Sequence, residues 1–246
     1  MVTLTLALLL AQSPDAKPTG GAATVTPGKV VSDMMNHYYN SSSSKGRIQM
    51  IQSAQGIAIS VDTEFQFAPP SKIYIKQVRR STSPAVSLVT SNGKHFSYPT
   101  PETPVSSKGA DRLIETVVQQ GVPLDYRQIY AAVSESLLDR CAPLDLAFAR
   151  TEDLKYLRDQ WATLDFLPGD NPAGDRVLGG QWRAYGSVPP AGTYKMTISK
   201  NNELKKFEMS ESVAFTDKIA GVVTTTWTCE IQTNATPEEK LFTLVR

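Results

Sequence analysis

A stretch with a repeat of two, residues 57–67, constrains the fold of this chain more than any other part of the sequence. Its odd positions carry apolar side chains or threonine, whereas its even positions carry small or polar ones. Successive side chains of a strand point to opposite faces, so the stretch predicts a strand with one apolar and one wet face. Pro69 and Pro70 are expected to end it, because proline has no N–H to donate.

Three more strands are predicted directly after this one, and the four together form an antiparallel meander. Apolar and basic or aromatic residues alternate over residues 72–76, and residues 86–90 and 95–98 flank Asn92-Gly93. Asn-Gly is typical of a two-residue hairpin in which both turn residues have positive φ. The side chains expected on the apolar face of the first two strands are Ile57, Ile59, Val61, Thr63, Phe65, Phe67, Ile73 and Ile75.

The last part of the chain is also predicted to be rich in strands. Tyr194, Met196 and Ile198 alternate with polar residues, and a longer alternation over residues 222–231 puts Trp227 and Cys229 on one face. Further strands are expected at residues 182–185, 204–209 and 241–245. The whole chain is therefore predicted to contain roughly ten strands.

Between these two β halves the apolar spacing becomes helical, and we expect a helical insert at about residues 110–162. One apolar stripe covers residues 113–118, and a longer one covers residues 126–141 and ends before Pro143. A third helix is expected to begin at residues 151–153 with a capping hydroxyl and acidic residues. Residues 144–149 alternate like a strand but lie between helices, so their interpretation stays open.

A shorter amphipathic helix is predicted before the meander, over residues 30–39. A curved sheet with an apolar face has to cover that face, and this helix and the insert are the segments able to do so. We therefore expect helices packed on a long antiparallel sheet within one domain, residues 29–246.

The N-terminal segment is expected to direct export. Residues 1–12 contain an apolar run of about ten residues, which suits a secretory signal and is too short to span a bilayer. The alternative is an unstructured apolar tail. Residues 13–28 are rich in proline, glycine and threonine and are expected to be a flexible linker. Export would place the protein in the periplasm or outside the cell.

Few residues suggest catalysis, metal binding or nucleic-acid binding. The net charge is +1, which gives no case for a polyanionic partner. The chain has two histidines and two cysteines, and the sequence contains no glycine-rich phosphate loop or paired-cysteine motif. We therefore expect no enzyme activity, no cofactor and no metal. Cys141 and Cys229 either form a disulfide in an oxidising compartment or are two buried thiols.

The order of the segments resembles the bacterial outer-membrane lipoprotein carrier (LolA-like) superfamily. The resemblance rests on the strand with its Pro-Pro stop, the basic strand, SLVTSNGKHFSYPTP and the closing TPEEKLFTLV, and it covers residues 28–101 and 177–246. It implies an α+β fold with an unclosed antiparallel β-barrel, a helical lid and an apolar cavity. In the known carriers an arginine precedes the proline that ends the early strand, whereas this sequence has Pro69 there.

This resemblance implies an exported, non-catalytic protein that binds lipid, acyl chains or lipoprotein. The alternative is a periplasmic protein-interaction or envelope-stress module of the same fold, which would present a groove or open edge to a peptide. The candidate cavity residues are Ile57, Ile59, Val61, Phe65, Phe67, Ile73, Ile75, Tyr194, Met196 and Trp227. Whether they fill a core or line a cavity is open at this level. Basic residues at 72, 76, 79 and 80 either meet lipid headgroups or protect a strand edge.

Overall fold

The computed structural model describes residues 25–81, 84–98, 114–117, 125–134, 137–148, 161–168, 174–183, 191–216 and 219–243. Its helices are α1 (Pro27–Tyr39), α2 (Tyr126–Val133), α3 (Ala142–Phe148) and the short 3₁₀ helix η2 (Glu239–Phe242). The strands of the first half are β1 (Ser44–Ala54), β2 (Ile57–Ala68), β3 (Lys72–Arg80), β4 (Ala85–Asn92), β5 (His95–Tyr98) and β6 (Ile114–Val117). Those of the second half are β7 (Asp165–Phe166), β8 (Arg176–Trp182), β9 (Gly192–Ile198), β10 (Leu204–Thr216) and β11 (Ile219–Thr233).

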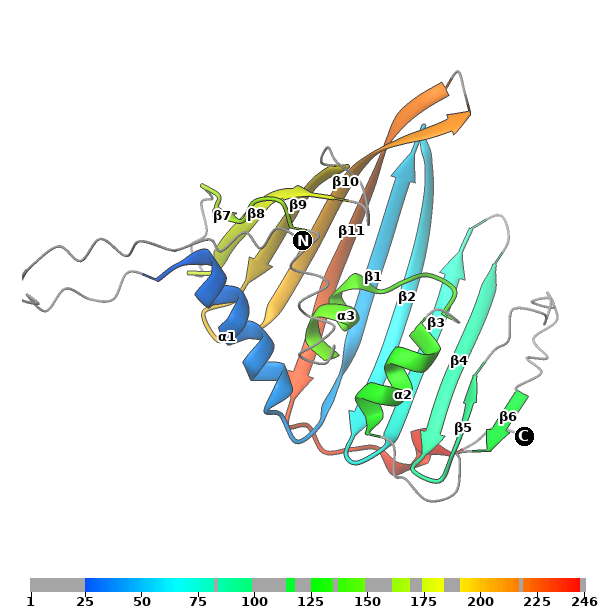
Figure 1. Ribbon diagram of the computed structural model, residues 1–246. Coiled ribbons are helices and arrows are strands. Elements are labelled where there is room, and N and C mark those ends of the chain that lie inside the picture. Colours follow the sequence, from blue (N-terminus) through cyan, green and yellow to red (C-terminus); the bar gives the residue numbers. More distant parts are fainter. Residues whose placement is uncertain are drawn as a thin grey trace, which may run out of the picture.

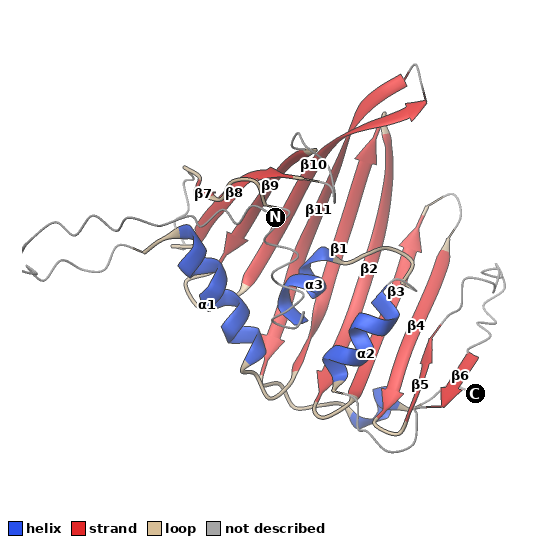
Figure 2. Cartoon of the chain, in the orientation of Figure 1, coloured by secondary structure: helices blue, strands red, loops and turns tan. Residues whose placement is uncertain are grey.

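These strands form one sheet in the order β6-β5-β4-β3-β2-β1-β11-β10-β9-β8-β7, and every pair is antiparallel. The sheet is curved and open, and α1, α2 and α3 all lie on one face of it, the inner face (Figure 1). Figure 2 shows the strands as one red layer, with the blue helices α1, α2 and α3 on one side of it. The predicted α+β class, an unclosed antiparallel sheet with a helical cover, is confirmed, with eleven strands among the described residues.

The predicted meander is present as β2 to β5, and its β4–β5 turn differs from the expectation. Gln55 and Gly56 join β1 to β2, and both have positive φ, 50° and 80°. At the β4–β5 hairpin only Gly93 does, with φ of 91°, so the prediction for Asn92 is wrong. Asn92 ends β4 instead, and its side-chain oxygen accepts a hydrogen bond from the N–H of Lys94.

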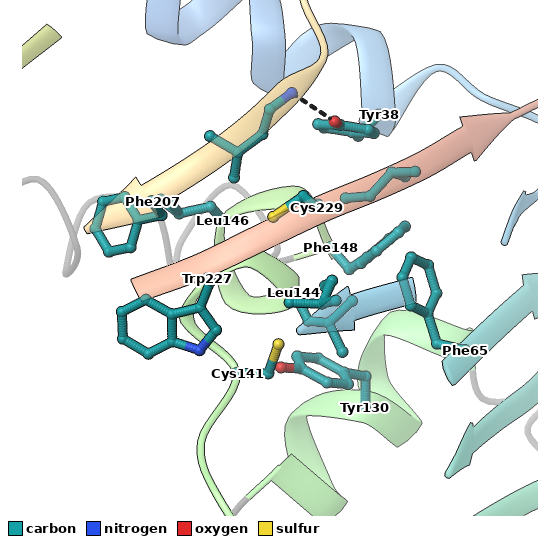
Figure 3. Packing of buried hydrophobic residues seen from close by; sticks show 14 of the residues in the cluster. Tyr38, Phe65, Tyr130, Cys141, Leu144, Leu146, Phe148, Phe207, Trp227 and Cys229 are labelled. Atoms are coloured by element: carbon teal, nitrogen blue, oxygen red, sulfur yellow. Dashed lines mark hydrogen bonds between the residues drawn. The ribbon is translucent and has the colours of Figure 1, made fainter. Parts of the chain in front are cut away.

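Aromatic side chains fill the core between the first half of the sheet and the helices. Phe148 of α3 is fully buried, and its ring centroid lies 4.4 Å from that of Phe67 and 5.6 Å from that of Phe65. Tyr126 of α2 packs on Phe67 with a centroid distance of 5.5 Å. Such tilted and edge-on contacts between rings stabilise a core beyond the area they bury. Figure 3 shows Phe65 and Phe148 side by side in this core.

The amphipathic helix predicted at residues 30–39 is confirmed as α1. It begins at Pro27, inside the segment expected to be a linker, and the hydroxyl of Thr26 caps it by accepting from the N–H of Lys29. Near its other end, the buried hydroxyl of Tyr38 accepts a 2.8 Å hydrogen bond from the N–H of Leu204. This bond fixes the helix to the start of β10.

The insert differs most from the sequence prediction. Ile114–Val117 is a strand that pairs with β5 and not a helix, since four apolar positions fit either state and pairing with a neighbour decides. The long helix expected over residues 126–141 ends at Val133. The next helix, α3, contains Pro143 in its first turn, where the missing N–H is tolerated. The open segment 144–149 is thus helical up to Phe148, and the helix expected from residues 151–153 lies outside the described residues.

The second half also has different strand limits. The strand expected at residues 182–185 is β8, which ends at Trp182 instead of starting there. The closing strand expected at residues 241–245 is wrong for its first two residues, which belong to η2. Phe242 of η2 packs against Ala68 and Tyr74 on the outer face of the sheet, so the end of the described chain covers this face rather than extending it.

Charges of alternating sign cross the outer face of the sheet. Glu230, Arg47, Glu64 and Lys76 lie opposite one another in register on β11, β1, β2 and β3. Opposite charges on neighbouring strands attract, whereas like charges would repel. β3 lies inside the sheet, so the interpretation of its basic residues as protection of a strand edge is wrong.

Candidate functional site

A hollow of about 330 Å³ lies on the inner face, between α3 and the strands of the second half of the sheet. The described residues that line it are Met50, Gln52, Asp139, Arg140, Ala142, Asp145, Leu146, Trp161, Trp182, Tyr194, Phe207, Met209, Glu211, Thr225 and Trp227. Figure 3 shows part of this lining, with Leu146 of α3 near Phe207 of β10 and Trp227 of β11.

The strand register arranges the floor of the hollow in three rows. The first row runs across the sheet through Met196, Phe207, Trp227 and Met50. The second row contains Tyr194, Met209, Thr225 and Gln52. The third row contains Trp182, Gly192, Glu211 and Val223. The floor therefore changes along the strands from an apolar row to one that carries a carboxylate.

A continuous series of neighbouring aromatic rings crosses this floor from one register row to the next. The ring of Trp161 stacks on that of Tyr194 with centroids 5.5 Å apart and planes 23° apart. Tyr194 lies 6.3 Å from Phe207, which lies 5.6 Å from Trp227. Together with Trp182, this places all three tryptophans of the chain on the wall of one hollow.

Trp161 reaches Tyr194 because the segment after it crosses β8 at a glycine. A Cβ on Gly180 would collide with the carbonyl of Thr163, so only glycine allows this crossing. The hydroxyl of Tyr194 donates a 2.6 Å hydrogen bond to the carbonyl of Thr163. The N–H of Gln181 donates to the hydroxyl oxygen of the same threonine. Burial raises the pKa of Tyr194 above its usual range, so this hydroxyl stays a donor.

The opposite wall, formed by α3 and the residues before it, is held by polar contacts. Tyr130 of α2 donates a 2.7 Å hydrogen bond to Asp145 Oδ1, and Arg140 donates to Asp145 Oδ2 at 2.6 Å. Gln77 of β3 bonds the backbone of Asp139 in both directions, since its amide nitrogen donates to the carbonyl and its amide oxygen accepts from the N–H. These contacts fix the position of α3 and the residues before it relative to the strands of the floor.

The charged groups of the hollow are mostly acidic. Among the described lining residues there are three carboxylates, Asp139, Asp145 and Glu211, and one guanidinium, Arg140, which pairs with Asp145. Burial raises the pKa of Glu211, and it also raises the pKa of Asp139 in spite of the opposing charge of Arg79. Glu211 has no hydrogen bond or ion pair with another described residue.

Two indole N–H groups of the lining also lack a partner. Trp182 Nε1 and Trp227 Nε1 are both buried and make no hydrogen bond within the described part of the protein. Trp227 itself is only 6% exposed. A buried donor without an acceptor costs free energy, so these two groups favour a ligand that offers acceptors to the hollow.

The ten predicted cavity residues fall into two groups. Tyr194 and Trp227 line the hollow, and Met196 is fully buried in the floor row of Phe207. The other seven lie in the first half of the sheet and outside the lining of this hollow. Five of them, Val61, Phe65, Phe67, Ile73 and Ile75, are buried in the core under the helices. Ile59 is half-buried, and Ile57, beside the β1–β2 turn, is 69% exposed.

Sequence reasoning missed several lining residues of the second half. Trp161 lies near the end of the expected helical insert and Trp182 at the start of an expected strand, and Phe207, Met209 and Glu211 have no assigned role in the sequence prediction. A usable signal was the position of all three tryptophans after residue 160, within or beside the second β half. Large rings with a polar edge are enriched where one side of a side chain is apolar and the other meets a ligand or water.

The described residues offer little for covalent or metal chemistry. Cys141 and Cys229 are buried free thiols, so the open question of a disulfide is answered in favour of two reduced side chains in this structure. His37 Nε2 lies 3.2 Å from the hydroxyl oxygen of Thr233, away from the hollow lining. Within the described ranges there is no cluster of three potential metal ligands. No helix in those ranges has the length and apolar character needed to cross a membrane.

Solved structures similar to this chain include members of the superfamily that its sequence resembles. A LolA superfamily protein from Nitrosomonas europaea is 10% identical, with a TM-score of 0.32, and the match covers 90% of this chain and 99% of that one. LprF from Mycobacterium bovis is 10% identical, with a TM-score of 0.38 and coverage of 82% and 91%.

The complex of MucA and MucB from Pseudomonas aeruginosa contains a chain that is 9% identical, with a TM-score of 0.43 and coverage of 89% of this chain and 61% of that one. No protein-family model and no curated protein sequence matches this chain. With TM-scores below 0.5, these likenesses assign no functional role to any residue of the chain.

Proposed function

We propose that this protein binds the acyl chain of a lipid or lipoprotein non-covalently in the hollow between α3 and β9–β11. The observation that carries the proposal is the lining itself, an aromatic and methionine-rich floor with two buried indole N–H groups that lack acceptors among the described residues. An acyl chain suits the floor, and the carbonyl of its ester or amide suits one of the two indole donors. A ligand of this class offers both apolar contacts to the floor and a hydrogen-bond acceptor to a buried N–H group.

The apolar contacts are sufficient for affinity without a reacting group. Transfer of each CH₂ group from water into such a site contributes about 0.8 kcal/mol. The volume of about 330 Å³ lies at the lower end of the range usual for small-molecule sites. The hollow therefore fits one chain or part of one better than a whole two-chain lipid. Binding without chemistry makes this a carrier-like or sensing protein and not an enzyme.

Export is part of the same proposal. The apolar run in residues 1–12 has the length of a secretory signal core, and the free lipid and lipoprotein of a bacterial envelope would supply the ligand. We place the protein in the periplasm or outside the cell on this ground. A fusion of residues 1–28 to a reporter that is active only after export tests the location separately from binding.

Tryptophan fluorescence provides a direct test of binding, because all three tryptophans line the hollow. Fatty acids brominated along the chain quench tryptophan on contact, so titration with them is expected to reduce the emission in a saturable manner. The unbrominated fatty acid should compete and restore it. Calorimetric titration of the protein with the same fatty acids gives the stoichiometry, which we expect to be one acyl chain per protein.

Two methionine variants supply a matched comparison. Met209 lines the hollow, whereas Met35 on α1 is partly buried elsewhere against the same core. Met209→Gln is expected to weaken acyl binding about fivefold through loss of apolar contact, and Met35→Gln to leave it unchanged. Equal effects of the two variants, or no saturable quenching in the parent protein, would contradict the proposal. A peptide segment of a protein partner would then be the next occupant to test.

A further inference from the structure

We propose that the hollow selects ligands whose apolar chain ends in a positively charged ammonium group, which binds beside Glu211. This inference rests on the function proposed above, because it adds the head group to a ligand whose chain occupies the floor. It is carried by the position of Glu211, the charge of the walls and the faces of the aromatic rings.

Glu211 stands at one end of the floor. It lies on β10 four positions after Phe207, on the same face, so the two Cα atoms are about 13 Å apart along the strand. The intervening row contains Met209 and Tyr194. A chain that lies along the floor from Phe207 and Trp227 therefore brings its end group to the row of Glu211. Apolar and charged parts of one ligand are matched by the two ends of the hollow.

The charge of the lining favours a cation over an anion. The described lining carries three carboxylates and one guanidinium, and that guanidinium donates to Asp145 at 2.6 Å. Among the described residues Glu211 has no such partner, whereas Asp139, whose Oδ2 is buried without a hydrogen bond, is opposed by the charge of Arg79. A carboxylate or phosphate head would face repulsion here, whereas an ammonium head would neutralise a partly buried charge.

Aromatic side chains line the hollow on the β8–β9 side of Glu211. Trp182 lies in the row of Glu211, and its Nε1 atom would lie 3.0 Å from a Cβ at Gly192, the residue between them in the sheet. Glycine at this position thus leaves room for the indole to lie over β9. Trp161 pairs with Trp182 as an isolated bridge, and its ring stacks on that of Tyr194 in the next row. Ring faces attract ammonium groups within about 6 Å, and a set of rings with one carboxylate is suited to a quaternary ammonium.

The unpartnered indole of Trp227 indicates a ligand independently of the acids. This residue is 6% exposed and lies in the row of Phe207, at the other end of the floor, and its buried N–H has no acceptor in the part of the chain that the structure describes. Among the described residues, the hollow therefore has a donor without an acceptor at the apolar end, Trp227 Nε1, and a carboxylate without a partner at the other end, Glu211. A single occupant that spans the three rows would lie against both groups.

Protonation of Glu211 should weaken this recognition. The other titratable groups in the described lining are Asp139 and Arg140 before α3, Asp145 on α3 and Tyr194 on β9. Burial raises the pKa of Glu211, so its charge is lost at a higher pH than that of an exposed glutamate. Affinity for a cationic ligand is therefore expected to fall as the pH is lowered through this pKa, with no such change for a neutral ligand.

The test compares three amphiphiles with the same dodecyl chain, each below its micelle concentration and at about pH 8, where the acids are ionised. They are dodecyltrimethylammonium, dodecanoate and neutral dodecyl maltoside, and binding is followed by tryptophan emission and calorimetry. We expect the ammonium compound to bind at least roughly tenfold more tightly than the other two. Glu211→Gln should reduce its affinity about tenfold and leave the affinity for the maltoside unchanged.

Glu208→Gln is the matched control, because Glu208 lies on the same strand but faces outward and pairs with Lys206. It should change none of the three affinities, and thermal unfolding checks that both variants fold. Equal binding of all three amphiphiles, or an unchanged ammonium affinity in Glu211→Gln, would overturn the head-group inference and leave acyl binding intact. If none of the three binds, the proposed function fails as well.

Discussion

The hydroxyl of Tyr130 on α2 donates a 2.7 Å hydrogen bond to Asp145 Oδ1 on α3, in the interior of the helical cover. Tyr130 is 3% exposed and Asp145 is 9% exposed. The carboxylate also accepts from Arg140, so one buried acid connects α2, α3 and the chain between them. A buried carboxylate is tolerated only when such partners compensate its lost hydration. The pair therefore determines how the two helices lie relative to each other and to the hollow.

Removal of this hydroxyl should destabilise the protein. In Tyr130→Phe the buried carboxylate loses one of its two donors, and we expect a loss of about 1–3 kcal/mol in the free energy of unfolding. Urea denaturation followed by circular dichroism measures it. Tyr39→Phe removes the same atom from a residue that is 52% exposed and should change the stability by less than about 0.5 kcal/mol. Equal stability of Tyr130→Phe and the parent protein would show that the bond is dispensable.

Phe148 should be among the most sensitive positions of the core. Its ring is fully buried and contacts Phe65, Phe67 and Tyr126. Phe148→Ala leaves a cavity under α3, so we expect a loss of about 3–5 kcal/mol in the free energy of unfolding. Phe166→Ala on the edge strand β7 is the control, since that side chain is 44% exposed. A cost of less than about 1 kcal/mol for Phe148→Ala would contradict the packing described.

The two cysteines should be unreactive in the folded protein. Burial raises the pKa of Cys229 to about 12 and that of Cys141 well above its usual value. Only the thiolate attacks alkylating reagents, so labelling with iodoacetamide at about pH 8 should be on the order of a thousandfold slower than for a free thiol. In denaturant both should react at ordinary rates. Mass spectrometry counts the labels, and fast double labelling of the native protein would disprove the burial of these groups.

Glu211 and Asp139 should make the stability depend on pH in a defined direction. Burial raises the pKa of each carboxyl in the folded state above its unfolded value. Folding therefore favours the protonated form, and this contribution is fully present below the unfolded pKa and is lost as the pH rises through the folded pKa.

Replacement of Glu211 by glutamine mimics the protonated form at all pH values. We therefore expect Glu211→Gln to be at least as stable as the parent at neutral pH, with the difference disappearing near pH 4, about the unfolded pKa of glutamate. Glu208→Gln, on the outer face of the same strand, should show no comparable gain at neutral pH. Thermal unfolding at several pH values measures the difference. A Glu211→Gln protein that is clearly less stable at neutral pH would show that the charge of Glu211 has a partner that stabilises it.

Local pattern was sufficient to predict most of the long strands of the sheet. The alternation that ends at Phe67 and the one through Tyr194 and Met196 correspond to observed strands, and their apolar sides face the helices. Such patterns persist because a shift by one residue would move the whole apolar set to the wet face. In the insert the runs were too short to distinguish states, and Ile114–Val117 became a strand through pairing with β5.

The hollow was only partly predictable, because it depends on register between distant segments. Trp182, Tyr194, Met209 and Trp227 meet only through the pairing of four strands, and no local spacing encodes that pairing. The sequence did indicate Tyr194 and Trp227 as cavity residues. It could not show that the apolar face of β2 and β3 is filled by Phe148 and its neighbours, since a filled core and a lined hollow have the same composition.

The pairing of β1 with β11 joins the two halves of the sheet from opposite ends of the sequence. Beside this seam, Ser42 bonds Asn234, 192 positions away. Closing so long a loop is entropically costly and slow, so the seam is expected to form late in folding. Met50 and Trp227, which face each other across it, both border the hollow. An occupant that touches both would hold the two halves together like a clasp, so the melting temperature should rise with its concentration.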